Sequence, residues 1–125
     1  MARAKRSRTG SGMRVLVTGG TGFVGFHTVK ALHEAGHQVR LLVRSPDKMH
    51  RVLGPFGLDT LDHVHGDIAD EKSVARALSG VDAVVHAAAN VNIHASDALE
   101  TIRTNRRGTE LVIGGAVQRG IERIV

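Results

Sequence analysis

Residues 18–25 read TGGTGFVG, and this stretch decides the fold of the chain. It follows the run RVLVT at 14–18, whose β-branched content predicts a buried strand. It precedes residues 23–35, whose apolar positions recur at helical spacing. The glycines of the stretch have the spacing G-x-x-G-x-x-G. Between a strand and a helix, this spacing is typical of a loop that holds the phosphates of a dinucleotide.

Each glycine of the motif has its own physical role. Gly19 permits a tight turn out of the strand, Gly22 lets a pyrophosphate approach the backbone, and Gly25 lets the helix pack closely on the sheet. The start of the helix then offers unpaired N–H groups and a partial positive charge to the phosphates. The alternative interpretation is a structural turn that binds no ligand.

Strand and helix alternate along the rest of the chain. We expect a helix to open at Ser45-Pro46 and residues 54–61 to form a loop. The other predicted strands are 38–43, 61–65, 81–86 and 121–125, and the other predicted helices are 71–79 and 97–119. This alternation predicts an α/β fold: a Rossmann-type, doubly wound parallel sheet with helices on both faces, which stops at its fifth strand. A sheet that ends there has an unprotected edge, so we expect marginal stability and a tendency to associate.

Local signals predict how the helices begin and end. Gly36 has the position of a left-handed cap for helix 23–35. Asp70 is expected to cap helix 71–79, and Asp97 with Glu100 has the spacing of a capping box. We expect the core face of the first helix to consist of Val24, Thr28, Leu32 and Ala35.

The charge of the chain belongs mostly to its first residues. The formal net charge is +5, but residues 1–12 contain four Lys or Arg and no acidic residue. The remainder is nearly neutral, so we predict a disordered basic tail at 1–12 and one domain at 13–125. Met13 directly precedes the first strand, which makes it a plausible natural start. Weak attraction of the tail to nucleic acid or a membrane surface is the minor alternative, and we expect neither partner.

Other classes of protein are disfavoured by composition. The chain has no Cys, and its eight His residues show no spacing typical of a metal site, so we predict no bound metal. His86 and His94 are expected to be structural or exposed. No apolar run approaches the length of a membrane span, and the basic start lacks the apolar segment of a secretory signal. We expect a cytoplasmic protein.

Residues at the ends of the predicted strands indicate which dinucleotide is bound. Arg44 follows the second strand, where NAD sites usually carry an acid for the ribose hydroxyls. An arginine there can instead pair with a 2′-phosphate, and Lys48 can add a second charge. After the third strand, Asp67 can accept from the adenine amino group while Ile68 covers the ring. NADP(H) is therefore favoured over NAD(H), although a solvated Arg44 and a turn-forming Asp67 are the alternatives.

These motifs together resemble the extended short-chain dehydrogenase/reductase family. TGGTGFVG, the arginine after the second strand, GDIAD, VVHAAA and TNRRGT carry the resemblance, which covers residues 13–125. Within the family, the chain is similar to the dihydroflavonol-reductase, hydroxysteroid-dehydrogenase and NAD-dependent epimerase/dehydratase group. The resemblance implies that the cofactor is bound by Gly19, Thr21, Gly22, Phe23, Val24, Gly25, Arg44, Lys48, Asp67, Ile68, Ala87, Ala88 and Ala89.

The resemblance also implies a reaction that this sequence does not complete. Asn105, in an N-x-x-G-T motif, would support a proton relay, or act structurally as a helix residue that needs partners. The family's proton donor is a Tyr followed by a Lys four residues later, and this chain contains no Tyr. The family dimer uses a helix pair that includes 97–119. The second helix of that pair is not in this sequence, so the dimer is doubtful for this chain.

Three functions remain open at this point. The first is the NADP(H)-binding part of an oxidoreductase that transfers hydride to or from a carbonyl or alcohol carbon of a small molecule. The second is a module that senses NADP(H) without turnover. The third is a truncated product that has little independent function.

Overall fold

The computed structural model describes residues 12–88 and 97–125 of the chain. The expectations for the basic tail, for Ala89 and for His94 lie outside the described residues. The elements are β1 (Arg14–Thr18), α1 (Phe23–Glu34), β2 (Gln38–Val43), α2 (Pro46–Leu53), the 3-10 helix η1 (Gly54–Phe56), β3 (Asp62–His65), α3 (Glu71–Leu78), β4 (Ala83–His86), α4 (Ala98–Gln118) and β5 (Arg123–Ile124).

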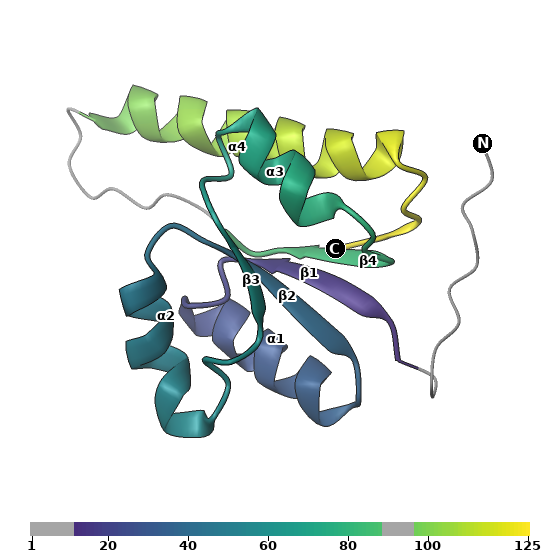
Figure 1. The fold of residues 1–125 in the computed structure, drawn as a ribbon. Coiled ribbons are helices and arrows are strands. Elements are labelled where there is room, and N and C mark those ends of the chain that lie inside the picture. The colour runs from purple at the N-terminus through teal and green to yellow at the C-terminus, as the bar shows by residue number, and fades with distance from the viewer. Residues whose placement is uncertain (1–11, 89–96) are drawn as a thin grey trace.

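The five strands form one parallel sheet in the order β3-β2-β1-β4-β5. Helices α1 and α2 cover one face of this sheet, and α3 and α4 cover the other (Figure 1). The predicted fold is therefore confirmed. Because β1 lies in the middle, the chain leaves it toward β2 on one side and returns to β4 on the other. This reversal creates the crevice where such sheets bind ligands.

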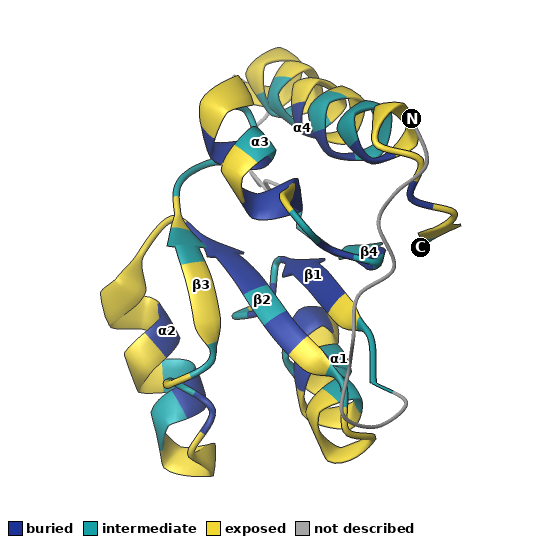
Figure 2. Cartoon of the chain, turned by 45° about the vertical axis from the view of Figure 1, so that its right-hand side comes forward, coloured by how far each residue is buried: buried dark blue, intermediate teal, exposed yellow. Residues whose placement is uncertain are grey.

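The alternation of side chains along β1 explains why both faces of the sheet are buried. Val15 and Val17 point into the core under α1 and α2, whereas Leu16 points into the core under α3 and α4. All three are almost inaccessible to solvent. In Figure 2, β1 is dark blue over most of its length. A strand buried on both sides needs a continuous apolar sequence, and the residues VLV at 15–17 provide one.

The predicted core face of α1 is wrong in part. Gly25 and Val29 are the buried residues of this helix, and Leu32 packs against the same core. Val24 is 67% exposed and Ala35 is also exposed. The close approach of Gly25 to the preceding turn sets the rotation of the helix, and this turns Val24 outward.

The helix ends follow the local signals with two exceptions. Asp70 accepts from the backbone N–H of Ser73, and Gly36 has a φ of 89°, as expected for their caps. The capping box at the start of α4 does not form, because no side chain caps that helix. The predicted loop at 54–61 contains the short helix η1 directly after α2.

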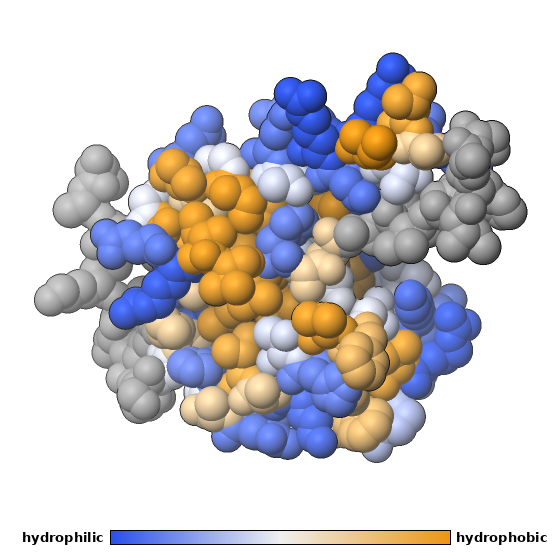
Figure 3. All heavy atoms as spheres, turned by 180° about the vertical axis from the view of Figure 1, so that it is seen from behind, coloured by the Kyte–Doolittle hydropathy of each residue, from blue (hydrophilic) through white to orange (hydrophobic). Residues whose placement is uncertain are grey.

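The two edges of the sheet are formed by β3 and β5. Near β5, the side chain of Val125 is 83% exposed. Seen from behind, hydrophobic side chains form an extended area on the surface (Figure 3).

Within the described residues, no helix is both long and apolar enough to cross a bilayer, and α4 itself carries several charges.

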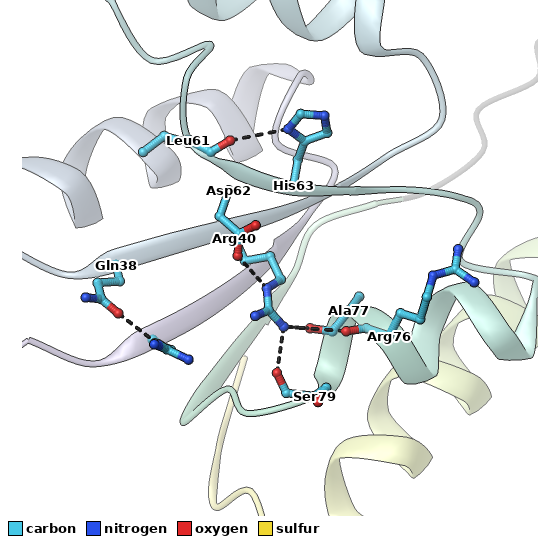
Figure 4. A network of polar contacts seen from close by, with 9 residues as sticks. Gln38, Arg40, Leu61, Asp62, His63, Arg76, Ala77 and Ser79 are labelled. Carbon is cyan, nitrogen blue, oxygen red and sulfur yellow. Dashed lines mark hydrogen bonds and ion pairs between the residues drawn. The ribbon is translucent and has the colours of Figure 1, made fainter. Parts of the chain in front are cut away.

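A half-buried arginine ties the sheet to the end of α3 (Figure 4). The Arg40 Nε atom donates to Asp62 Oδ2 at 2.8 Å, and Nη1 donates to the carbonyls of Ala77 and Ser79 at 3.0 and 2.6 Å. The side chain of Arg40 is only 18% exposed. These carbonyls belong to the last turn of α3, where a cation is favourable. The sequence alone did not indicate this role.

We expect Arg40→Met to lower the free energy of unfolding by about 1 to 2 kcal/mol, because it removes the charged donor from the part-buried carbonyl of Ala77 and from two more exposed acceptors, Asp62 and the carbonyl of Ser79. Urea denaturation followed by circular dichroism measures the effect. Arg106→Met is the matched control. Arg106 is 80% exposed and pairs with Glu110 one helical turn away, so its loss should cost less than about 0.5 kcal/mol. Equal losses for both variants would contradict the role of Arg40.

Candidate functional site

A pocket of about 520 Å³ lies at the carboxyl ends of the strands. Its walls come from the β1–α1 turn, from the residues that follow β2, β3 and β4, and from α4. This is the crevice next to the point where the strand order reverses. The lining residues are Gly19, Gly20, Thr21, Gly22, Leu42, Val43, Arg44, Ser45, Lys48, Gly66, Asp67, Ile68, Ala87, Ala88 and Thr104.

The glycine loop brings three pieces of backbone into contact. Gly19 has a φ of 74°, and a Cβ there would lie 2.6 Å from the backbone nitrogen of Ala88. A Cβ on Gly25 would overlap the carbonyl oxygen of Gly19. The turn can therefore close only without these side chains. At Gly22, by contrast, a Cβ would meet only one atom at ordinary contact distance, so this residue faces open space.

The start of α1 differs electrostatically from the starts of α2 and α3. Ser45 and Asp70 cap α2 and α3 with their side chains, and each of those helices has an acidic residue in its first turn. The N-cap of α1 is Gly22, no side chain caps the helix, and its first turn has no acidic residue. The first N–H groups and the positive end of this helix are therefore free to bind an anion.

Charged side chains line the pocket beyond β2 and β3. Arg44 Nε lies 3.6 Å from Asp67 Oδ2, and these side chains are 73% and 43% exposed. Lys48, in the first turn of α2, is also exposed and lines the pocket. The other carboxylate oxygen of Asp67 accepts from the backbone N–H of Ala69 at 2.9 Å. Asp67 thus forms a turn through Oδ1 and an ion pair through Oδ2, and the residue lines the pocket.

The structure brings together most, but not all, of the predicted site residues. Phe23 and Val24 are 82% and 67% exposed and do not line the pocket, and Gly25 is buried behind the loop. Asn105 is half-buried on α4, while its neighbour Thr104 is the residue that lines the pocket. The predicted residues that do line it are Gly19, Thr21, Gly22, Arg44, Lys48, Asp67, Ile68, Ala87 and Ala88.

Sequence reasoning missed several lining residues. Leu42, Val43 and Gly66 lie at or directly after the ends of β2 and β3, and the rule that ligands bind at carboxyl ends of strands could have identified them. Ser45 was predicted only as a helix start. Thr104 belongs to the TNRRGT motif, but no role was predicted for it, because its place depends on how α4 crosses the sheet.

A hydrogen-bonded histidine stabilises the end of β4 below the pocket. The hydroxyl of Thr18, which is fully buried, lies 2.7 Å from His86 Nδ1 and accepts from the N–H of Ala88 at 3.2 Å. On its other side, His86 Nε2 lies 3.4 Å from the hydroxyl of Thr109 in α4. Burial lowers the pKa of His86 below its ordinary value of 6.5. The neutral ring therefore links β1, β4 and α4, in line with the expected structural role.

A second pocket of about 510 Å³ lies at the opposite, amino end of the sheet. Its two arginines are already engaged, since Arg14 Nε donates to Gln38 Oε1 and Arg40 Nε donates to Asp62. The two pockets have nearly the same volume, but they differ in the groups that are available to bind an anion. Only the pocket at the carboxyl ends opens onto an uncapped helix start.

In the part of the chain that the structure describes, no group of three or more His, Asp or Glu residues could hold a metal ion.

Known proteins are similar to this chain over most of its length. The sequence profile described as "NAD dependent epimerase/dehydratase family" matches residues 15–125. A 3-beta-hydroxysteroid dehydrogenase of Mycolicibacterium neoaurum is 35% identical over 118 residues, which cover 90% of this chain and 31% of that protein. A 2-alkyl-3-oxoalkanoate reductase of Stenotrophomonas maltophilia is 38% identical over 114 residues, covering 90% of this chain and 32% of that protein.

Solved structures share the same arrangement. A short-chain dehydrogenase/reductase superfamily protein from Agrobacterium tumefaciens, with bound NAD, has a TM-score of 0.74 and 29% sequence identity. The similarity covers 89% of this chain and 31% of that one. The chain thus spans about a third of the length of the proteins it matches.

We expect acid to destabilise the fold through His86. Its pKa is lower in the folded than in the unfolded chain, so between these two values the unfolded state binds more protons. The stability that His86 contributes is complete above about pH 6.5 and is lost as the pH falls through the folded pKa. The difference in free energy of unfolding between the unchanged chain and His86→Gln should therefore shrink from pH 7.5 to pH 5. A difference that is constant with pH would contradict this.

Proposed function

The chain belongs to the NAD dependent epimerase/dehydratase family, and on this premise we propose that its pocket binds a nicotinamide dinucleotide as part of an oxidoreductase. The observation that carries the proposal is the uncapped start of α1, which opens from the glycine loop at the carboxyl ends of the strands. Gly22 leaves space there for a pyrophosphate, and the first N–H groups of the helix supply its hydrogen bonds.

The pocket suits the separate parts of a dinucleotide. The N–H groups of Phe23 and Val24 would hold the pyrophosphate, which explains how these residues act although their side chains point to solvent. Asp67 and Ile68 would contact the adenine ring. Ala87 and Ala88 are small, and their backbone packs against Gly19, so that the cofactor can lie across the strand ends.

Arg44 supports NADP(H) as the preferred cofactor. Its guanidinium is mostly exposed and is held near the pocket by Asp67 at 3.6 Å, with Lys48 as a second positive charge. A 2′-phosphate carries more charge than the exposed Asp67 carboxylate and can take two parallel hydrogen bonds from an arginine. The similar Agrobacterium tumefaciens structure has bound NAD, so direct comparison of the two cofactors is informative.

We propose that the chain is part of a longer protein that transfers hydride between the nicotinamide and a carbonyl or CH–OH carbon of a small molecule. The cofactor supplies the hydride chemistry, and this chain binds and orients it. Asn105 would support the proton relay from α4. The chain contains no Tyr, so the proton donor that the family resemblance implies is not among its residues. We therefore propose that turnover requires segments outside these 125 residues.

The experiment that tests this proposal is calorimetric titration of the chain with NADP⁺ and, separately, NAD⁺. We expect tighter binding of NADP⁺. Arg44→Ala should weaken NADP⁺ binding about 10- to 100-fold, the loss of one charge-assisted contact, and change NAD⁺ binding about twofold or less.

Arg51→Ala is the matched control for this change. Arg51 is an exposed cation in the last turn of α2 and does not line the pocket, so its loss should leave both affinities nearly unchanged. Equal weakening of NADP⁺ binding by the two variants would reduce the effect to general charge and would contradict a specific phosphate contact. Absence of binding to either dinucleotide would contradict the proposed function itself.

A further inference from the structure

Gly108 is a buried glycine in the interior of α4, where glycine is unfavourable. It lies within the 21-residue helix Ala98–Gln118, and a glycine in a helix interior costs about 1 kcal/mol relative to alanine. A Cβ at this position would lie 2.5 Å from Ile68 Cδ1, 2.8 Å from Cγ1 and 3.3 Å from Cβ. No side chain therefore fits at residue 108 unless Ile68 moves.

Ile68 lies between α4 and the pocket. Its side chain packs with the core under α3 and α4 and meets the helix at Gly108, and the same residue lines the pocket beside Asp67. The backbone on both sides of Ile68 is held by the hydrogen bond from the N–H of Ala69 to Asp67. A side chain pushed away from α4 at this point has its free space on the pocket side.

The other glycines of α4 do not have this relation to the pocket. At Gly114, a Cβ would meet no atom within 4 Å, and at Gly115 the nearest atom belongs to Leu78 in α3. Gly108 is also part of the TNRRGT motif, in which only Asn105 had been given a role. The contact with Ile68 gives the glycine of this motif a physical reason.

We infer that Gly108 is a positioning residue for the nucleotide pocket. Because Gly108 has no side chain, the side chain of Ile68 can pack against α4. This leaves room for the adenine ring between Ile68 and the strand ends. The inference rests on the proposed function and adds a residue on α4 that sets the width of the adenine subsite. Only Cδ1 is the far end of the Ile68 side chain, and Cγ1 and Cβ also lie within 3.3 Å of the added atom, so the whole side chain must shift. An added methyl group is therefore expected to narrow the pocket and to cost some stability.

The test uses AMP, which carries only the adenine half of the dinucleotide, and NADP⁺. Gly108→Ala should weaken the binding of both ligands about tenfold. Gly114→Ala, on the same helix and with open space around it, should leave both affinities unchanged. A merely structural role of Gly108 would lower the melting temperature without this selective loss of affinity.

A second variant separates positioning from general damage to the helix. Ile68→Ala removes Cδ1 and Cγ1, the two atoms that would lie less than 3.0 Å from the added methyl group, and leaves only Cβ at 3.3 Å. In that background Gly108→Ala should weaken AMP binding much less than in the unchanged chain, which a double-mutant cycle measures. The Cδ1 resonance of Ile68 should shift in Gly108→Ala and not in Gly114→Ala.

The outcomes distinguish the inference from its premise. Binding of AMP and NADP⁺ that Gly108→Ala leaves intact would overturn the inference and leave the proposed function in place. Equal losses in Gly108→Ala and Gly114→Ala, or additive losses in the cycle, would also overturn it. No binding of either ligand by the unchanged chain would overturn the proposed function and, with it, this inference.

Discussion

The close approach of backbone around the glycine loop is the constraint on which the rest of the site depends. Gly19 turns the chain with a left-handed φ against the backbone of Ala88, and Gly25 lies against the carbonyl of Gly19. These contacts place the first turn of α1 directly over the strand ends. They also set the rotation of α1, which buries Val29 and exposes Val24. One steric condition thus determines both the packing of the helix and the direction of its uncapped N–H groups.

Close packing also defines the far side of the pocket, where α4 lies against the strand ends. Thr18, His86 and Thr109 link β1, β4 and α4 by hydrogen bonds. In α4, Gly108 directly precedes Thr109. α4 is therefore held at a short distance from the strand ends. The pocket is bounded by a tight loop on one side and a closely packed helix on the other, while the charged residues Arg44, Lys48 and Asp67 lie at its more exposed part. The glycines thus determine the shape of the pocket, and the residues that follow β2 and β3 determine its charge.

The sequence predicted the features that depend on local spacing. The glycine loop, the order of strands and helices, and the caps at Asp70 and Gly36 are of this kind, because each depends on residues only a few positions apart. One local signal, the capping box at Asp97 and Glu100, was wrong. The other failures occurred where the answer depends on contacts across the fold. The core face of α1 was assigned from Val24 rather than Gly25, and the partners of Arg40 lie 22 to 39 residues away, in β3 and at the end of α3. Asp67 had two interpretations, and the structure shows the turn together with an ion pair that no spacing predicts.

Nuclear magnetic resonance of the ¹⁵N-labelled chain during titration with NADP⁺ tests the central claim most directly, since it reports each backbone N–H separately. We expect saturable shifts that are largest for the amides of Phe23 and Val24, at the start of α1, with further shifts near Asp67 and Ile68. Shifts confined to the pocket at the amino end of the sheet, around His37 and Arg40, would contradict it. So would a titration in which the amides of the first turn of α1 do not respond.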